Sequence, residues 1–222
     1  MASAHVVELD ERTLLLMIRR LGRTLDDLQK LRIQHMLRHK ALERDLGTLL
    51  PLDQVLISLE QVEHEARLEL VRLWRKHKLA PWAKPIKGIG ELSISRLIAE
   101  IGVERVDKET GEINRAPLNS DTVSQLWAYC GYDPNRRRRK GMTQEEARAC
   151  GSPRAKTQCY LIATAMLKSG NRELYDARRE HTASREDWPL LRQHNDALRI
   201  VAKRFLRDLW VANKEIEPCS SG

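Results

Sequence analysis

The sequence predicts a mainly α-helical protein, in which a long N-terminal helical hairpin or coiled coil precedes a compact helical domain. That domain is expected to contain a helix-hairpin-helix motif and a small β-hairpin insertion. Hydrophobic residues make up 41% of the 222 residues, charged residues 32% and aromatic residues 5%. Apolar residues recur at helical spacing over most of the chain, and one short segment interrupts this pattern.

Residues 1–78 are predicted to form two amphipathic helices. Each helix carries a stripe of apolar residues along one face, which we call a seam. The first seam has alternating spacings of four and three and consists of Leu14, Ile18, Leu21, Leu25 and Leu28. The second seam consists of Val55, Leu59, Val62, Ala66, Leu70 and Leu73. Gly47 and Pro51 lie between them and indicate a turn. A helix pair buries too little surface to be stable alone, so we expect this region to form a homodimer or a higher homo-oligomer. The alternative is that both seams pack on the C-terminal domain.

The rest of the chain is predicted to fold as one compact unit. Residues 79–86 contain two prolines and are interpreted as a linker, and residues 87–213 as the nucleic-acid-binding domain. Within it, residues 103–119 predict the β-hairpin, and a final helix is expected over about 190–212. Residues 214–222 have little pattern and are interpreted as a tail.

Charge and cysteine content narrow the class of protein. Lys and Arg outnumber Asp and Glu by 39 to 31, which gives a net charge of +8 and suits a polyanionic partner. The four cysteines form no CxxC pair, which favours reduced thiols in a cytosolic protein. No segment approaches the roughly 20 apolar residues of a membrane span, and the start does not read as a signal peptide. We therefore expect a soluble, cytoplasmic, nucleoid-associated protein without a membrane partner.

The stretch KGIGEL has the pattern of a glycine bend followed by a helix. Glycines allow a tight turn, and the unpaired amides of the next helix attract phosphate. A short apolar turn of this kind holds the nucleic-acid backbone without reading its sequence. The alternative is that the glycines simply end one helix and start another. The expected contact residues are Lys84, Lys87, Gly88, Gly90, Glu91 and Leu92.

A run of five cations forms the second candidate for nucleic-acid binding. It consists of Arg136, Arg137, Arg138, Arg139 and Lys140. Each arginine offers a planar fork suited to phosphate oxygens or guanine edges. Arg154 and Lys156 extend the predicted surface. The alternative is a solvated loop, or a cluster paired with Glu145 and Glu146.

Three segments in this order resemble the C-terminal domain of the insertion-sequence-110 family of transposases. They are IKGIGELSISRLIAEIG, SQLWAYCGYDP and HNDALRIVAKRFLRDLW, and the similarity covers roughly residues 84–212. The helices before them are similar to the coiled-coil region of that family. The resemblance implies DNA binding and strand exchange, with an RNase H-like domain that binds metal and a serine that attacks DNA.

The sequence departs from that family at both catalytic parts. The first long helix begins by about residue 12, which leaves no room before it for an RNase H-like sheet. No serine lies between Pro134 and Gly151, and Ser152 is interpreted as a helix cap before Pro153. We therefore expect a non-catalytic, transposase-derived DNA-binding protein that needs no cofactor and no metal. It would act as a structural, regulatory or recombination-accessory factor.

Two alternatives stay open at this point. One is a minimal recombinase that uses Ser152 and borrows metal carboxylates from a partner. The other is a protein–protein adaptor whose positive charge is incidental. RNA also stays open as a ligand, because contacts to phosphate do not distinguish it from DNA.

Overall fold

The computed structural model describes residues 10–106, 111–136 and 138–216, and this part of the chain is mainly helical. The N-terminal helices are α1 (Glu11–Leu46) and α2 (Gln54–Trp74), followed by α3 (Ala80–Ala83) and α4 (Glu91–Ile101). Strands β1 (Arg105–Val106) and β2 (Ile113–Asn114) and a 3-10 turn (Pro117–Asn119) come next. The remaining helices are α5 (Val123–Tyr129), α6 (Gln144–Ala149), α7 (Pro153–Lys168), α8 (Glu173–Ala183) and α9 (Leu190–Ile216).

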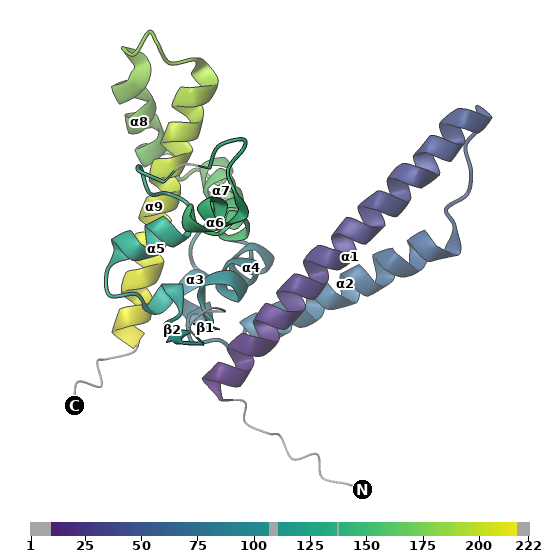
Figure 1. Cartoon of the computed structure of the whole chain (residues 1–222), viewed down its shortest axis with the longest axis horizontal. Coiled ribbons are helices and arrows are strands. Elements are labelled where there is room, and N and C mark those ends of the chain that lie inside the picture. The colour runs from purple at the N-terminus through teal and green to yellow at the C-terminus, as the bar shows by residue number, and fades with distance from the viewer. Residues whose placement is uncertain (1–9, 107–110, 137, 217–222) are drawn as a thin grey trace, which may run out of the picture.

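Helices α1 and α2 form an antiparallel hairpin that we call the stalk. It projects from the rest of the molecule (Figure 1). Asp10 caps α1 by accepting a hydrogen bond from the amide of Thr13, and Asp53 caps α2 in the same way at Leu56. Gly47 ends α1 with a φ of 66°, a conformation that glycine adopts without strain. The predicted helical hairpin and its turn are confirmed.

The base of the stalk is part of the hydrophobic core. Leu14, Ile18 and Leu25 of α1 are buried, as are Leu70 and Trp74 of α2. They belong to the same buried cluster as residues of α4, α7 and α9. The first part of the α1 seam and the last part of the α2 seam are therefore buried against the C-terminal domain, which the alternative interpretation proposed for both seams as a whole.

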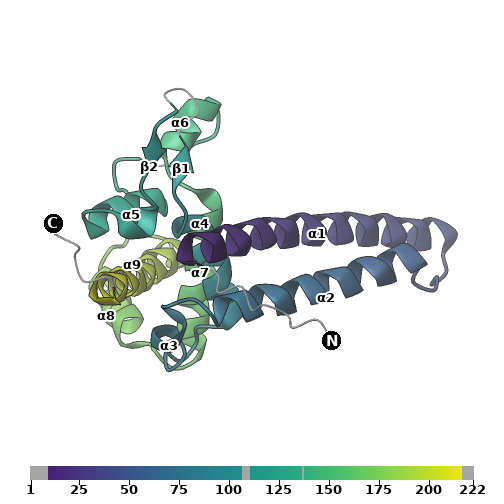
Figure 2. The ribbon, with the colours of Figure 1, turned by 90° about the horizontal axis from the view of Figure 1, so that it is seen from below.

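Among the residues that the structure describes, none outside the stalk covers its outer half. Leu37 is 62% exposed and Val55 is 56% exposed, although the sequence placed Val55 on a seam. Figure 2 shows from a second direction that this half of the stalk extends away from the other helices. Other large apolar side chains exposed on this half are Leu31, Ile33, Leu42, Leu46, Leu49, Leu52, Ile57 and Val62.

The segment interpreted as a linker is packed rather than extended. Residues 79–86 include α3, and Leu79 and Ala83 are buried in the core. The prolines that suggested a linker fit this structure because Pro81 lies in the first turn of α3, where a proline costs no hydrogen bond. The boundary between residues 78 and 87 therefore does not separate two independent cores.

The remaining predicted elements are present, with small shifts in their bounds. Strands β1 and β2 pair antiparallel, with Val106 opposite Ile113, which confirms the β-hairpin. Helix α9 extends to Ile216, so the first residues of the predicted tail are helical, and residues 217–222 lie outside the described part. None of the helices in the described ranges combines the length and apolar character needed to cross a membrane.

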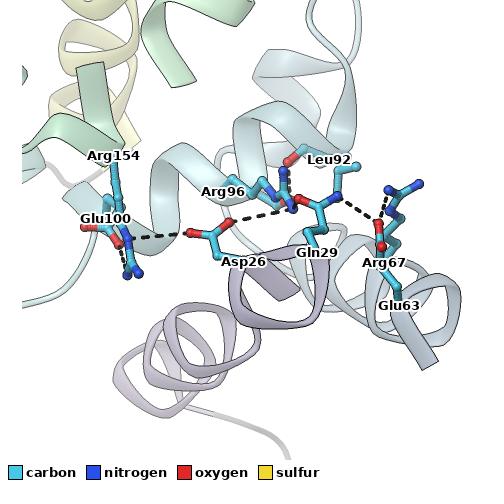
Figure 3. A network of polar contacts seen from close by, with 9 residues as sticks. Asp26, Gln29, Glu63, Arg67, Leu92, Arg96, Glu100 and Arg154 are labelled. Atoms are coloured by element: carbon cyan, nitrogen blue, oxygen red, sulfur yellow. Dashed lines mark hydrogen bonds and ion pairs between the residues drawn. The ribbon is translucent and has the colours of Figure 1, made fainter. Parts of the chain in front are cut away.

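A chain of polar contacts ties the stalk to the domain (Figure 3). Glu63 of α2 accepts hydrogen bonds from Gln29 and Arg32 of α1 and from Arg67 of its own helix. Gln29 in turn accepts from Arg96 of α4 at 2.6 Å. Burial alone would raise the pKa of Glu63, but the hydrogen bonds from Arg32 and Gln29 and the charge of Arg67 outweigh it, so its pKa is lowered.

The same chain of contacts continues from α1 to α7. Asp26 lies 3.7 Å from Arg96 and 3.7 Å from Arg154, and Arg154 also lies 3.8 Å from the buried Glu100. Arg23 approaches Glu100 from α1 at 3.7 Å. These pairs fix the base of the stalk against α4 and the first turn of α7.

Candidate nucleic-acid interface

A cavity of about 460 Å³ lies beside the arginine-rich loop, and we call it the basic cavity. Segments that are distant in the sequence form it: the loop that follows α5, the first turn of α7, and the end of the α8–α9 segment together with the start of α9. Its walls are lined by Gly131, Tyr132, Asp133, Pro134, Arg138, Lys156, Trp188, Arg192, Asn195, Asp196 and Arg199.

Local backbone geometry places Lys156 in this wall. Gly131 ends the α5 segment with a φ of 75°, and the stem of Lys156 passes close to it: a Cβ at Gly131 would lie 3.1 Å from Cδ of Lys156. The amide of Ser152 donates to the carbonyl of Tyr129 at 2.7 Å, which joins the start of α7 to the end of α5. The loop and the helix are therefore held in one place, with the lysine between them.

Ser152 is the N-cap of α7, which confirms its interpretation as a cap. Its hydroxyl oxygen accepts a hydrogen bond from the amide of Ala155 at 3.2 Å, and Pro153 occupies the first turn. Thr143 and Glu146 form a capping box at the start of α6.

The electrostatic balance of the basic cavity is positive. Asp196 accepts hydrogen bonds from Arg178 at 2.6 Å and Arg199 at 2.8 Å. Burial alone would raise the pKa of Asp196, but these two hydrogen bonds and the arginine charges outweigh it and lower the pKa. Asp196 therefore stays ionised and offsets the positive charge of Arg178 and Arg199. It does not offset the charge of the other basic groups around the cavity.

Three cations around the basic cavity lack such a carboxylate. Among the described residues, none places a carboxylate within ion-pair distance of Arg138, Lys156 or Arg192. These cations come from the loop, from α7 and from α9, so they surround the opening instead of lying along one helix face. Phosphate oxygens are suitable counter-charges for such a group.

An aromatic ring lies within the same group of cations. Trp188, in the segment between α8 and α9, is half-buried, and the guanidinium of Arg192 lies 4.2 Å from its ring centroid. Arg185 approaches the same ring at 4.6 Å. Both contacts are within the range of a cation–π interaction.

The other predicted loop residues have different surroundings. Arg136 lies 3.7 Å from Asp133, and the amide of Arg139 donates to the sulfur of Met142. Lys140 is exposed, and Arg137 lies outside the described residues. Arg154, although only two residues from Lys156, belongs to the contacts that hold the stalk, with Asp26 and Glu100 as partners.

The glycine bend forms a separate region, in the order expected for a helix-hairpin-helix motif but with a first helix of only one turn. Gly90 is the N-cap of α4 and is exposed. Within the described part of the chain, the amides of Gly90, Glu91 and Leu92 donate no hydrogen bond to a neighbouring group. They are the unpaired donors that the sequence predicted at this helix start.

The two glycines of the bend have different roles. Gly88 has a φ of 89°, and a Cβ there would lie 2.5 Å from both Cα of Met166 and Oγ of Ser169. The space beside Gly88 is therefore filled by the end of α7, not left for a phosphate. At Gly90 the nearest atom to an added Cβ is Oγ of Ser93 at 4.0 Å, so that side is open.

The charges around the bend are partly neutralised. Glu91 forms two hydrogen bonds with Arg75, at 2.8 and 2.6 Å, which lower the pKa of its carboxylate. A second cavity, of about 670 Å³, lies beside this pair and is lined in part by Lys84. Lys87 is exposed, and its carbonyl accepts a hydrogen bond from the side chain of Asn171. The two cavities share no described residue, so the bend and the arginine-rich loop do not form one pocket.

Sequence reasoning did not include Trp188, Arg192 and Asn195 among the contact residues. A lone tryptophan between two helices carries no binding signature, so no signal in the sequence pointed to Trp188. The proximity of α9 to the loop after α5 is a tertiary feature, and no spacing within either segment reveals it.

The His, Cys, Asp and Glu side chains of the described ranges form no group of three or more suited to a metal ion. Comparisons of the chain with protein-family models, with curated proteins and with solved structures found no match.

Proposed function

We propose that this chain is a DNA-binding protein that holds the sugar-phosphate backbone in the basic cavity. The observation that supports this most directly is the group of Arg138, Lys156 and Arg192, which surround one opening without carboxylate partners in the described chain. Contacts of this kind position a protein on nucleic acid without reading its sequence. The net charge of +8 provides long-range attraction to the same ligand.

The unpaired amides at the start of α4 are proposed as a second contact to phosphate. The open side of Gly90 supports this role, and the neutralisation of Glu91 by Arg75 removes most of the repulsion between Glu91 and an anion. The proposed process follows from the resemblance to transposases: a structural, regulatory or recombination-accessory role without catalysis, close to the nucleoid.

The test is the salt dependence of DNA binding by a triple variant, Arg138→Ala, Lys156→Ala and Arg192→Ala. Each lost phosphate contact should reduce the slope of log K against log salt by about one. We expect affinity to fall tenfold or more near physiological salt and the slope to decrease by about two to three. Filter binding or fluorescence anisotropy over a salt series measures both quantities.

The matched control removes the same charge from sites that have partners. Arg72, Arg172 and Arg204 pair with Glu69, Asp176 and Asp208 respectively. Their triple alanine variant should lose less than threefold in affinity, because each arginine is already neutralised locally. Equal losses of DNA affinity in the two triple variants would mean that net charge alone explains the effect. That result would contradict the proposed binding of DNA in the basic cavity.

We further propose that two copies of the chain pair through the outer half of the stalk, where the large apolar side chains are exposed. A variant that replaces residues 33–60 with a short Gly/Ser turn retains Glu63 and the buried base. We expect it to fold, to sediment as a monomer and to bind DNA at least tenfold more weakly, because linked sites raise the effective concentration. A shortened chain that still sediments as a dimer would refute this role.

A further inference from the structure

We infer that the basic cavity receives one unpaired nucleotide of a strand, with its base against Trp188 and its phosphates on the surrounding cations. This inference rests on the proposed function and specifies the class of ligand at the same site. The shared chemistry is that of a nucleoside phosphate, so the free nucleotide and the nucleotide within a strand must be distinguished by experiment.

The dimensions of the cavity favour a single nucleotide over a duplex. Its volume of about 460 Å³ is within the range of about 300–1,000 Å³ for sites that enclose small molecules. A base that is stacked and paired in a duplex presents only its edges in the grooves, whereas an unstacked nucleotide can enter a concave site. A double helix could contact only the opening, where its phosphates would meet the same cations.

Trp188 provides a surface on which a base can stack. Every base has a π-face, so an aromatic ring binds unpaired nucleotides with little regard to sequence. The guanidiniums of Arg192 and Arg185 lie over this ring at 4.2 and 4.6 Å. A base that stacks on the ring must therefore displace one of them. Arg192 pairs with no carboxylate in the described chain, so it can turn from the ring to the adjoining phosphate.

Other polar groups in the cavity wall also suit a bound nucleotide. Asn195 lines the cavity and carries both a donor and an acceptor, so its amide can pair with the edge of any base. Asp196 is neutralised by Arg178 and Arg199, so it does not repel a phosphate strongly. The cations come from three segments, which allows phosphates on both sides of one base to be bound.

The experiment compares a 12-nucleotide single strand, a 12-base-pair duplex of the same sequence and a mononucleotide, using the full chain. Trp188→Ala should weaken single-strand binding by roughly five- to 150-fold, the range found when a stacking aromatic is removed, and should change duplex binding by less than twofold. Trp188→Phe, which keeps an aromatic face, should restore most of the single-strand affinity. Leu190→Ala, two residues away at the start of α9 and 73% exposed, is the control for local disturbance and should change neither.

Two outcomes would overturn the inference. If Trp188→Ala weakens single-strand and duplex binding by the same factor, or weakens neither, the ring does not receive a base. If the mononucleotide binds as tightly as the 12-nucleotide strand, the ligand is a free nucleotide. A failure of the proposed function looks different: neither nucleic acid would bind in a salt-dependent manner, and the triple alanine variant would behave as the unmodified chain does.

Discussion

Replacing Gly88 with alanine should lower the free energy of unfolding by about 3–5 kcal/mol. Two costs combine at this position: a φ of 89° strains any residue with a side chain, and the added Cβ would lie 2.5 Å from the backbone Cα of Met166. The carbonyl of Ala165, at 2.8 Å, also blocks a small adjustment. Urea denaturation followed by circular dichroism measures the change.

Gly90→Ala is the matched control for this experiment, because it alters the same bend without either cost. Gly90 has an ordinary φ of −77°, and nothing lies closer than 4.0 Å to the new methyl group. We expect a loss of about 1 kcal/mol or less, since alanine is a poorer N-cap than glycine. Equal stability of the two variants would contradict the close approach of Gly88 to α7.

The Gly90→Ala variant also tests the second proposed contact to phosphate. If the amides at the start of α4 bind phosphate, a methyl group at Gly90 should weaken DNA binding by several-fold while the fold remains intact. Unchanged affinity would mean that the bend does not contact DNA. The basic cavity would then remain as the proposed binding site.

Replacing Glu63 with glutamine should destabilise the chain by about 2–3 kcal/mol. Glu63 is 2% exposed and accepts hydrogen bonds from two arginines, Arg32 and Arg67, which would lose their counter-charge. The partial exposure of those arginines keeps the loss below that of a fully buried pair. Glu69→Gln, at the exposed pair with Arg72, should change stability by less than about 0.5 kcal/mol.

The contribution of Glu63 to the free energy of unfolding should depend on pH in a defined direction. Its pKa in the folded chain is lowered from the usual value of 4.5, so its contribution is fully present above that value. The contribution is lost as the pH falls through the lowered pKa, because the carboxylate then becomes protonated in the folded chain too. The stability difference between the unmodified chain and Glu63→Gln should therefore be constant above about pH 5.5 and should shrink below 4.5. A difference that stays constant down to pH 3 would contradict this account.

The helical architecture was predictable because its signals are local. Apolar spacing identified the stalk, Gly47 identified its turn, and Ser152 followed by Pro153 identified the start of α7. Which half of the stalk is buried was not predictable, since the seam pattern of Leu14 and that of Val55 look alike. Burial depends on where α4 packs, and that is a property of the whole fold.

The candidate site was predictable only in part, for the same reason. The arginine-rich loop and Lys156 were identified from their charge, and the structure brings Arg138 and Lys156 to one cavity. Arg154 carries the same charge two residues away but is bound by Asp26 and Glu100 from other helices. Whether an arginine is available to a ligand depends on distant carboxylates, which a local sequence pattern does not reveal.

The length of α1 has a consequence for how a pair of chains would reach DNA. Its 36 residues extend about 54 Å at the usual helical rise, and only the first part is anchored in the core. If the proposed pair met end to end at the far ends of its helices, it would hold its two cation groups farther apart than one turn of the double helix, about 34 Å. Such a pair would act as a spacer that bridges separate DNA segments or distant points on one, with the helix length setting the span.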